Sequence, residues 1–143
     1  GRPAATALVF LPLIIVWACD SLAMAGGAVM GGPKFAPVVS PNKTWSGTIT
    51  GSVAATVAGP LYGLAVLQPV GIELGWERLA LLGLVLSALG QVGDLAESLF
   101  KREAGVKDSG GIFPGHGGVL DRLDSLYWAL PAAAALLAAY RVL

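Results

Sequence analysis

LALLGLVLSALGQVG, residues 79–93, followed by DLAESLF, residues 94–100, decides the fold. The first 15 residues carry no charge and make about 22 Å of helix at 1.5 Å per residue. That length is too short to cross a hydrocarbon core roughly 30 Å thick. A membrane helix that starts at Leu79 must therefore continue through Asp94 and Glu97 toward Phe100. The sequence thus predicts a membrane helix with two carboxylates near one end.

The composition of the whole chain also indicates a membrane protein. Of the 143 residues, 55% are hydrophobic and 13% are charged, whereas about 25% charged residues is usual in a soluble domain. Uncharged runs cover residues 3–19, 44–72, 79–93 and 125–140. We therefore predict an all-α, polytopic integral membrane bundle of about four transmembrane helices. Because a proline removes a helical hydrogen bond, we expect a kink at Gly59–Pro60.

Residues 25–47 are rich in glycine and proline, which predicts a loop that carries Lys34 and Lys43. The loop after the third span is also basic, whereas the opposite side has fewer cations, so both loops are expected in the cytoplasm. Helix alternation then places the acids near the membrane in a single leaflet, around a polar cavity that opens to the cytoplasm; they are Asp20, Asp94, Glu97, Asp121 and Asp124. The net charge of zero gives no reason to expect nucleic acid as a partner.

Spacing places the acids of the third and fourth spans on two polar helix faces. Carboxylates opposed across a cavity suit one or two Mg²⁺ ions that also bind phosphate oxygens, and we favour Asp94 and Asp121 as the ligands. The alternative is that the acids only neutralise nearby cations in interfacial salt bridges. Two further choices stay open from the residues alone. His116 is either a base or phosphate contact or a structural loop residue, and Asp108 lies in what reads as an ordinary turn.

A longer motif extends from residue 98 to residue 124, SLFKREAGVKDSGGIFPGHGGVLDRLD. It resembles the signature of the phosphatidate cytidylyltransferases, also called CDP-diacylglycerol synthases. The fixed polar positions and glycines of that signature are all present: Ser98, Lys101, Arg102, Lys107, Asp108, His116, Gly117, Gly118, Asp121, Arg122 and Asp124. Asp20, Ser40–Pro41, Lys43–Trp45 and Gly93–Asp94 resemble the family's remaining motifs. Met24 and Ala28 depart from it, where relatives often have tyrosine and a basic residue.

The resemblance implies transfer of a cytidylyl group from CTP to phosphatidic acid, with Mg²⁺, and two metal ions are expected. It implies catalytic roles for Asp94, Asp121, Asp124, Lys101, Arg102, Lys107 and Arg122. It implies substrate contacts from Asp20, Lys43, Ser98, Asp108, His116, Gly117 and Gly118. The expected location is the cell inner membrane, in contact with membrane lipid, and a homodimer is left open. Residues 1–143 are expected to form one catalytic region, the carboxy-terminal half of an enzyme with further spans before it.

Two other functions compete with this one. A CTP-dependent polyprenol kinase would also be a membrane enzyme that uses metal and CTP, but it would transfer the γ-phosphoryl group to an alcohol. An ion-coupled transporter would use acids inside the membrane to bind its coupling ion, with Gly59–Pro60 as a helix break. The full signature favours the cytidylyltransferase.

Overall fold

The computed structural model describes residues 1–105 and 120–142, with side chains described up to residue 105 and from Ser125 onward. The helices are α1 (Arg2–Met30), α2 (Trp45–Tyr62), α3 (Trp76–Glu103) and α4 (Leu120–Ala139). A short antiparallel hairpin of β1 (Lys34–Ala36) and β2 (Ser40–Thr44) joins α1 to α2. A π-helical turn, η1 (Gly63–Leu67), and a 3₁₀ turn, η2 (Gln68–Val70), follow α2.

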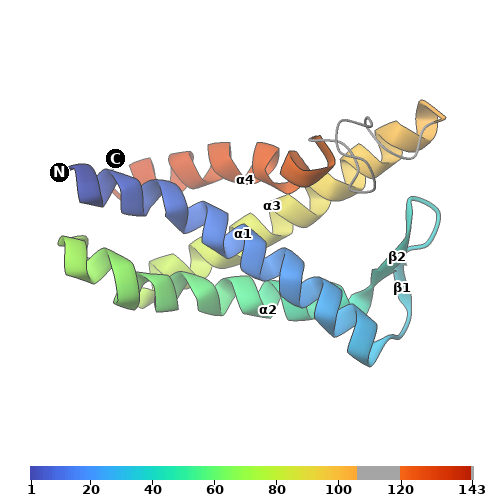
Figure 1. The fold of residues 1–143 in the computed structure, drawn as a ribbon, viewed down its shortest axis with the longest axis horizontal. Coiled ribbons are helices and arrows are strands. Elements are labelled where there is room, and N and C mark those ends of the chain that lie inside the picture. The colour runs from blue at the N-terminus through green and yellow to red at the C-terminus, as the bar shows by residue number, and fades with distance from the viewer. Residues whose placement is uncertain (106–119, 143) are drawn as a thin grey trace.

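Successive helices run in opposite directions, so both chain termini lie at one end of the bundle (Figure 1). The β1–β2 hairpin and the beginning of α4 lie at the other end (Figure 1). Among the described residues, α1, the segment Trp45–Val70 and α3 are each long and apolar enough to span a membrane. The apolar part of α4, Ser125–Ala139, is shorter. The prediction of an all-α polytopic membrane protein is confirmed, with three full-length spans and a shorter fourth helix.

Glycines bring the helix backbones into direct contact. A Cβ atom added at Gly47 would lie 2.5 Å from the carbonyl oxygen of Ala23, and one at Gly51 would lie 2.8 Å from that of Cys19, so α2 presses on α1. A Cβ at Gly83 would lie 2.7 Å from the carbonyl carbon of Ala55, so α3 presses on α2. Small residues at helix interfaces are how membrane helices gain close van der Waals packing, since lipid tails are as apolar as the helices.

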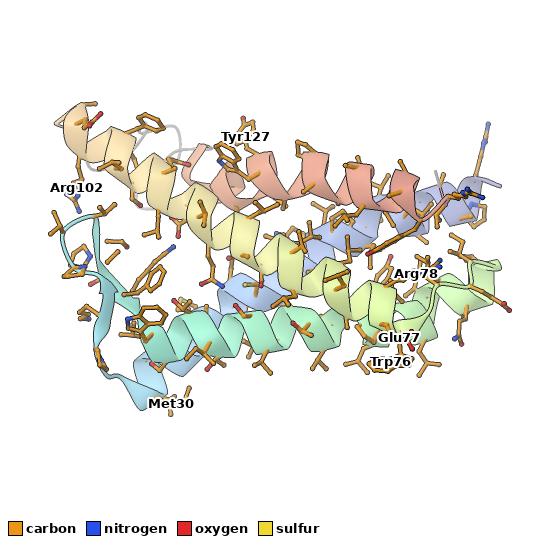
Figure 2. All side chains as sticks on the ribbon, turned by 180° about the vertical axis from the view of Figure 1, so that it is seen from behind. Met30, Trp76, Glu77, Arg78, Arg102 and Tyr127 are labelled. Atoms are coloured by element: carbon orange, nitrogen blue, oxygen red, sulfur yellow. The ribbon has the colours of Figure 1, made fainter. Side chains whose placement is uncertain are left out.

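The outer faces of the bundle are apolar, and several of its polar groups form hydrogen bonds within the protein, as expected for a protein surrounded by lipid. Large side chains such as Phe10, Trp17 and Leu64 are exposed, as expected for residues that contact lipid. Several helical hydroxyls are satisfied within their own helix, for example Thr56 Oγ1, which donates to the Ser52 carbonyl at 2.8 Å. At the end away from the hairpin, the Arg78 guanidinium lies 5.6 Å from the ring centre of Tyr140 and joins α3 to the region after α4 (Figure 2).

The expectation of a loop over residues 25–47 is wrong in two respects. First, α1 continues through Gly26 and Gly27 to Met30. At Gly26 the close approach of Thr50 leaves no room for a side chain, so this glycine serves helix packing rather than helix termination. Second, much of the remaining segment forms the β hairpin. At the predicted kink, Pro60 lies inside α2, and the α-helix gives way to the π-helical turn three residues later.

We predict that Gly83→Ala destabilises the bundle and that Gly90→Ala does not. The new methyl group at residue 83 would collide with the backbone of Ala55, and overpacking of this kind costs about 1–3 kcal/mol. At residue 90, on the same helix, the nearest atom would be Ser125 Cβ at an ordinary 3.6 Å. Thermal unfolding of both variants in detergent measures the difference. Equal midpoints for the two variants would show that α2 and α3 do not meet at Gly83.

Candidate functional site

A pocket of about 660 Å³ opens at the hairpin end of the bundle. Its wall combines the second half of α1, the hairpin, the first turns of α2, the middle of α3 and Ser125 of α4. Carboxylate, amide and hydroxyl groups line it together with two lysines: Asp20, Asp94, Asn42, Gln91, Thr44, Thr48, Ser125, Lys34 and Lys43. This volume lies within the range of about 300–1,000 Å³ that is typical of small-molecule sites.

The hairpin is held in place by the beginning of α2. Thr44 is the N-cap of α2, where its hydroxyl accepts a hydrogen bond from the Gly47 N–H at 3.2 Å. The Ser46 hydroxyl donates to the Gly31 carbonyl, and the Trp45 N–H donates to the Pro33 carbonyl at 3.1 Å. The rings of Phe35 and Trp45 meet edge to face at 4.7 Å. These contacts fix Lys43, the residue just before the cap, at the mouth of the pocket.

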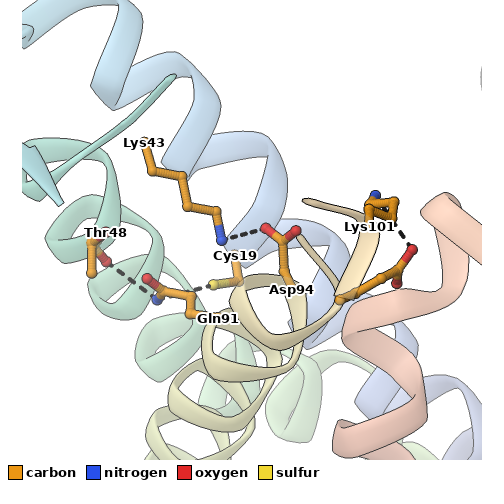
Figure 3. A network of polar contacts seen from close by, with 7 residues as sticks. Cys19, Lys43, Thr48, Gln91, Asp94 and Lys101 are labelled. Carbon is orange, nitrogen blue, oxygen red and sulfur yellow. Dashed lines mark hydrogen bonds and ion pairs between the residues drawn. The ribbon is translucent and has the colours of Figure 1, made fainter. Parts of the chain in front are cut away.

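Lys43 Nζ forms an ion pair with the Asp94 carboxylate of α3 (Figure 3). The two side chains are 24% and 31% exposed, so the pair is shielded from bulk solvent on most sides and yet remains reachable from the pocket. Asp20 of α1 lies close enough to interact with both charges, and Ser125 is its side-chain hydrogen-bond partner. The structure therefore brings together Asp20, Lys43 and Asp94, three of the residues that the sequence singled out.

Gln91 is a member of this site that the sequence reading missed. Its amide nitrogen contacts the Thr48 carbonyl at 3.4 Å and Cys19 Sγ at 3.9 Å (Figure 3). It also donates to Ser52 Oγ at 3.0 Å. One side chain of α3 thus joins α1 and α2, about one helical turn before Asp94. The signal was available, because Gln91 is an amide side chain in an otherwise apolar membrane helix, and such a group is expected to face a partner inside the bundle.

The remaining predicted residues of α3 lie beyond the pocket. Lys101 Nζ is 3.4 Å from the Glu97 carboxylate, four residues earlier on the same helix. Both acids of α3 thus form an ion pair, Glu97 within its own helix and Asp94 with a lysine from the hairpin. Ser98 is half-buried, and the described lining of the pocket does not include it. Arg102 is exposed in the last turn of α3 (Figure 2).

The other predicted residues belong to the signature between α3 and α4. Asp121, Arg122 and Asp124 belong to the first turns of α4, at the hairpin end of the bundle (Figure 1). Their side chains are outside the described part of the chain. The remaining five lie outside the described residues altogether: Lys107, Asp108, His116, Gly117 and Gly118. Their proposed roles stay predictions.

The pocket offers the donor atoms that a hard divalent cation prefers. Asp20 and Asp94 supply carboxylate oxygens, and Asn42, Thr48 and Ser125 supply neutral oxygens. Within residues 1–105 and 125–142, no cluster of three or more histidine, cysteine or acidic side chains forms a complete metal site. The donor chemistry nevertheless fits Mg²⁺, which usually takes one or two carboxylates and completes its shell with water and phosphate oxygens.

An apolar helical bundle with carboxylates and two lysines gathered in a pocket at one end is the architecture of a polytopic membrane protein with a polar site at the edge of its spans. Residues 2–140 match the sequence profile of the cytidylyltransferase family. The chain belongs to this family, which confirms the resemblance found in residues 98–124.

Several relatives carry a more specific name. Over 132 residues the chain is 54% identical to a phosphatidate cytidylyltransferase of Brucella abortus, an alignment that covers 92% of this chain and 45% of that protein. Proteins of the same name from Rickettsia bellii and Staphylococcus haemolyticus are 43% and 46% identical over 87% and 82% of this chain. These alignments cover 54% and 44% of the two proteins, so the chain spans about half the length of these relatives.

We predict that Gln91→Leu loosens the contact of α3 with α1 and α2. The variant loses the three contacts of the amide nitrogen, which we expect to cost about 1–2 kcal/mol of stability. It should also expose Cys19, which is buried next to Gln91. Maleimide labelling of Cys19, followed by peptide mass spectrometry, should therefore become faster. Gln68→Leu, the same change at an exposed position in η2, is the control. Unchanged labelling of Cys19 in Gln91→Leu would contradict the bridging role.

Proposed function

We propose that this chain forms the catalytic region of a phosphatidate cytidylyltransferase. The observation that carries the proposal is the pocket at one end of an apolar bundle, where Lys43 and Asp94 present opposite charges side by side. The complete signature over residues 98–124 and the names of the relatives support CTP and phosphatidic acid as the substrates. Those names give no support to a polyprenol kinase or an ion-coupled transporter.

The reaction is a nucleotidyl transfer between two anions. A phosphate oxygen of phosphatidic acid attacks the α-phosphorus of CTP, and a new P–O–P linkage forms. The bond from the α-phosphorus to the oxygen that bridges it to the β-phosphorus breaks, and pyrophosphate leaves. Because the attacking phosphate is already ionised at neutral pH, no dedicated general base is required. Catalysis then consists mainly of charge neutralisation and alignment.

The charged residues of the site divide these tasks. Asp94 and Asp121, helped by Asp124, would hold Mg²⁺, which when bound neutralises phosphate charge and orients the reacting groups. Lys43 already contacts Asp94, so a phosphate oxygen on the Lys43 ammonium lies beside the metal-binding carboxylate. Lys101, Arg102, Lys107 and Arg122 supply further positive charge for the triphosphate, the lipid phosphate and the departing pyrophosphate. Ser98, Asp108, His116, Gly117 and Gly118 complete the proposed substrate contacts.

The position of the site fits substrates that arrive from two phases. The pocket lies where α1 ends and α2 begins, at the edge of the apolar spans, which is where a soluble nucleotide and the headgroup of a membrane lipid can meet. Because the loops at this end are basic, the positive-inside rule supports a site that faces the cytoplasm.

We predict that Asp94→Asn and Asp121→Asn each abolish CDP-diacylglycerol formation in the full-length protein. Losing either charge removes a carboxylate that holds the metal near the substrate phosphates. Glu77→Gln, at the opposite end of α3, removes an equivalent charge and should leave turnover unchanged. Product formation from radiolabelled CTP measures activity, and thermal unfolding shows that the variants are folded. Near-normal turnover of either aspartate variant at ordinary Mg²⁺ would exclude that residue as an essential ligand.

We also predict that two cations serve different substrates. Lys101→Ala should mainly raise the KM for CTP, because Lys101 lies toward the outer end of α3. Arg122→Ala should mainly impair the use of phosphatidic acid, because Arg122 lies in the first turn of α4, nearer the lipid phosphate plane. Each effect should correspond to one lost charge-assisted hydrogen bond, roughly 1.5–3 kcal/mol or about 10- to 150-fold.

Initial rates over a grid of CTP and phosphatidic acid concentrations separate the two effects. Arg141→Ala, in the segment after α4 at the far end of the bundle, is the control for loss of a positive charge. If both variants impaired the use of CTP and of phosphatidic acid equally, the cations would act as a single shared electrostatic clamp.

A further inference from the structure

The hairpin side of the pocket contains a second lysine that the proposed mechanism does not use. Lys34 is the first residue of β1, pairs in register with Thr44 of β2, and lines the pocket. Asn42 of β2 lines the same wall, as do Gly31 and Gly32, which precede β1. This wall belongs to the connection between the helices, so it is the part of the pocket farthest from the apolar spans.

The charge of Lys34 is available to a ligand. Lys43 pairs with Asp94, and Lys101 pairs with Glu97. Lys34, in contrast, has no carboxylate within ion-pair distance in the part of the chain that the structure describes. Lys34 is also exposed. An exposed ammonium group that lines a polar pocket attracts anions, and the described residues do not neutralise it as Asp94 neutralises Lys43.

The two glycines leave the backbone beside Lys34 uncovered. Gly31 and Gly32 have φ angles of +59° and +101°, which side-chain-bearing residues rarely adopt. A Cβ added at either position would meet no atom within 4 Å. The glycines are therefore required by the turn rather than by packing. They also leave open space next to Lys34 and Asn42 for a bulky group such as a phosphate.

We propose that Lys34 and Asn42, next to the open Gly31–Gly32 backbone, form a phosphate-binding subsite for the terminal phosphates of a water-soluble nucleotide. The assignment rests on the proposed function and extends it, because it gives the hairpin a substrate role of its own. Lys34 donates to a phosphate oxygen as a cation, and the Asn42 side-chain amide donates as a neutral group. A soluble polyphosphate is favoured over the lipid phosphate, because the hairpin lies outside the apolar helices that contact the bilayer.

Binding measured without catalysis tests this subsite. The full-length protein in phosphatidylcholine nanodiscs is titrated by calorimetry with CTP and, separately, with pyrophosphate, both in EDTA so that metal ligands do not contribute. Lys34→Gln should raise the Kd for both anions about tenfold, as expected for one lost charge-assisted hydrogen bond. Lys34→Arg should stay within about threefold of the native protein. Asn42→Asp, which adds a negative charge to the same wall, should also weaken the binding of both anions.

Two controls make the result specific. Arg2→Gln removes a positive charge at the far end of α1 and should leave both affinities unchanged. A titration with short-chain phosphatidic acid should also be unaffected by Lys34→Gln. Unchanged Kd values for CTP and pyrophosphate in Lys34→Gln would overturn the proposal. A selective loss of phosphatidic acid affinity would overturn the nucleotide assignment as well.

The same experiment separates this proposal from the proposed function. If pyrophosphate binding depends on Lys34 while the native protein makes no CDP-diacylglycerol, the subsite stands and the cytidylyltransferase assignment fails. If the native protein is active and Lys34→Gln binds both anions normally, only the subsite fails.

Discussion

The charge of Asp94 inside a membrane helix is the constraint on which the rest of the site depends. A carboxylate within a membrane helix is costly to remove from water, so it needs a partner or a polar cavity. Lys43 supplies the partner, and it can do so only because the hairpin folds back over the pocket. The hairpin in turn needs Thr44 to cap α2 and Ser46 to bind the Gly31 carbonyl. The hairpin therefore has a structural role at the end of the helical bundle, because it carries Lys43 to the half-buried Asp94 carboxylate.

The width of the pocket is set by backbone contacts rather than by large side chains. Gly47 and Gly51 let α2 approach α1 just below the hairpin. Gln91 then bridges the remaining space between α3 and these two helices through contacts with Cys19, Thr48 and Ser52. Interfaces of this kind deform little, because backbone atoms cannot change rotamer as a side chain can. The three helices can thus hold Asp20, Lys43 and Asp94 at fixed positions even though each residue comes from a different element.

Sequence patterns predicted the helices and the end of the bundle where the acids gather, because charge and hydropathy alone place a segment relative to a bilayer. They failed at residues 25–30, where Gly26 and Gly27 were interpreted as helix breakers. Those glycines remain helical because α2 packs against them. The local sequence around the glycines gives no sign of this tertiary contact. Sequence patterns singled out both Lys43 and Asp94 but did not predict that the two side chains pair with each other. It joins residues 51 positions apart through a hairpin whose register depends on its anchoring to both α1 and α2.

The pairing of Lys43 with Asp94 also suits the chemistry proposed for the pocket. A carboxylate and an ammonium group in contact are nearly neutral together, so the Lys43–Asp94 pair does not place a net charge near the apolar spans. A divalent cation and a phosphate that enter together also bring nearly balanced charges. In the proposed complex the cation would bind the Asp94 carboxylate, and the phosphate would bind the Lys43 ammonium group. On this proposal the pocket would exchange one compensated set of charges for another, which would keep the electrostatic cost of binding two highly charged groups beside a membrane low.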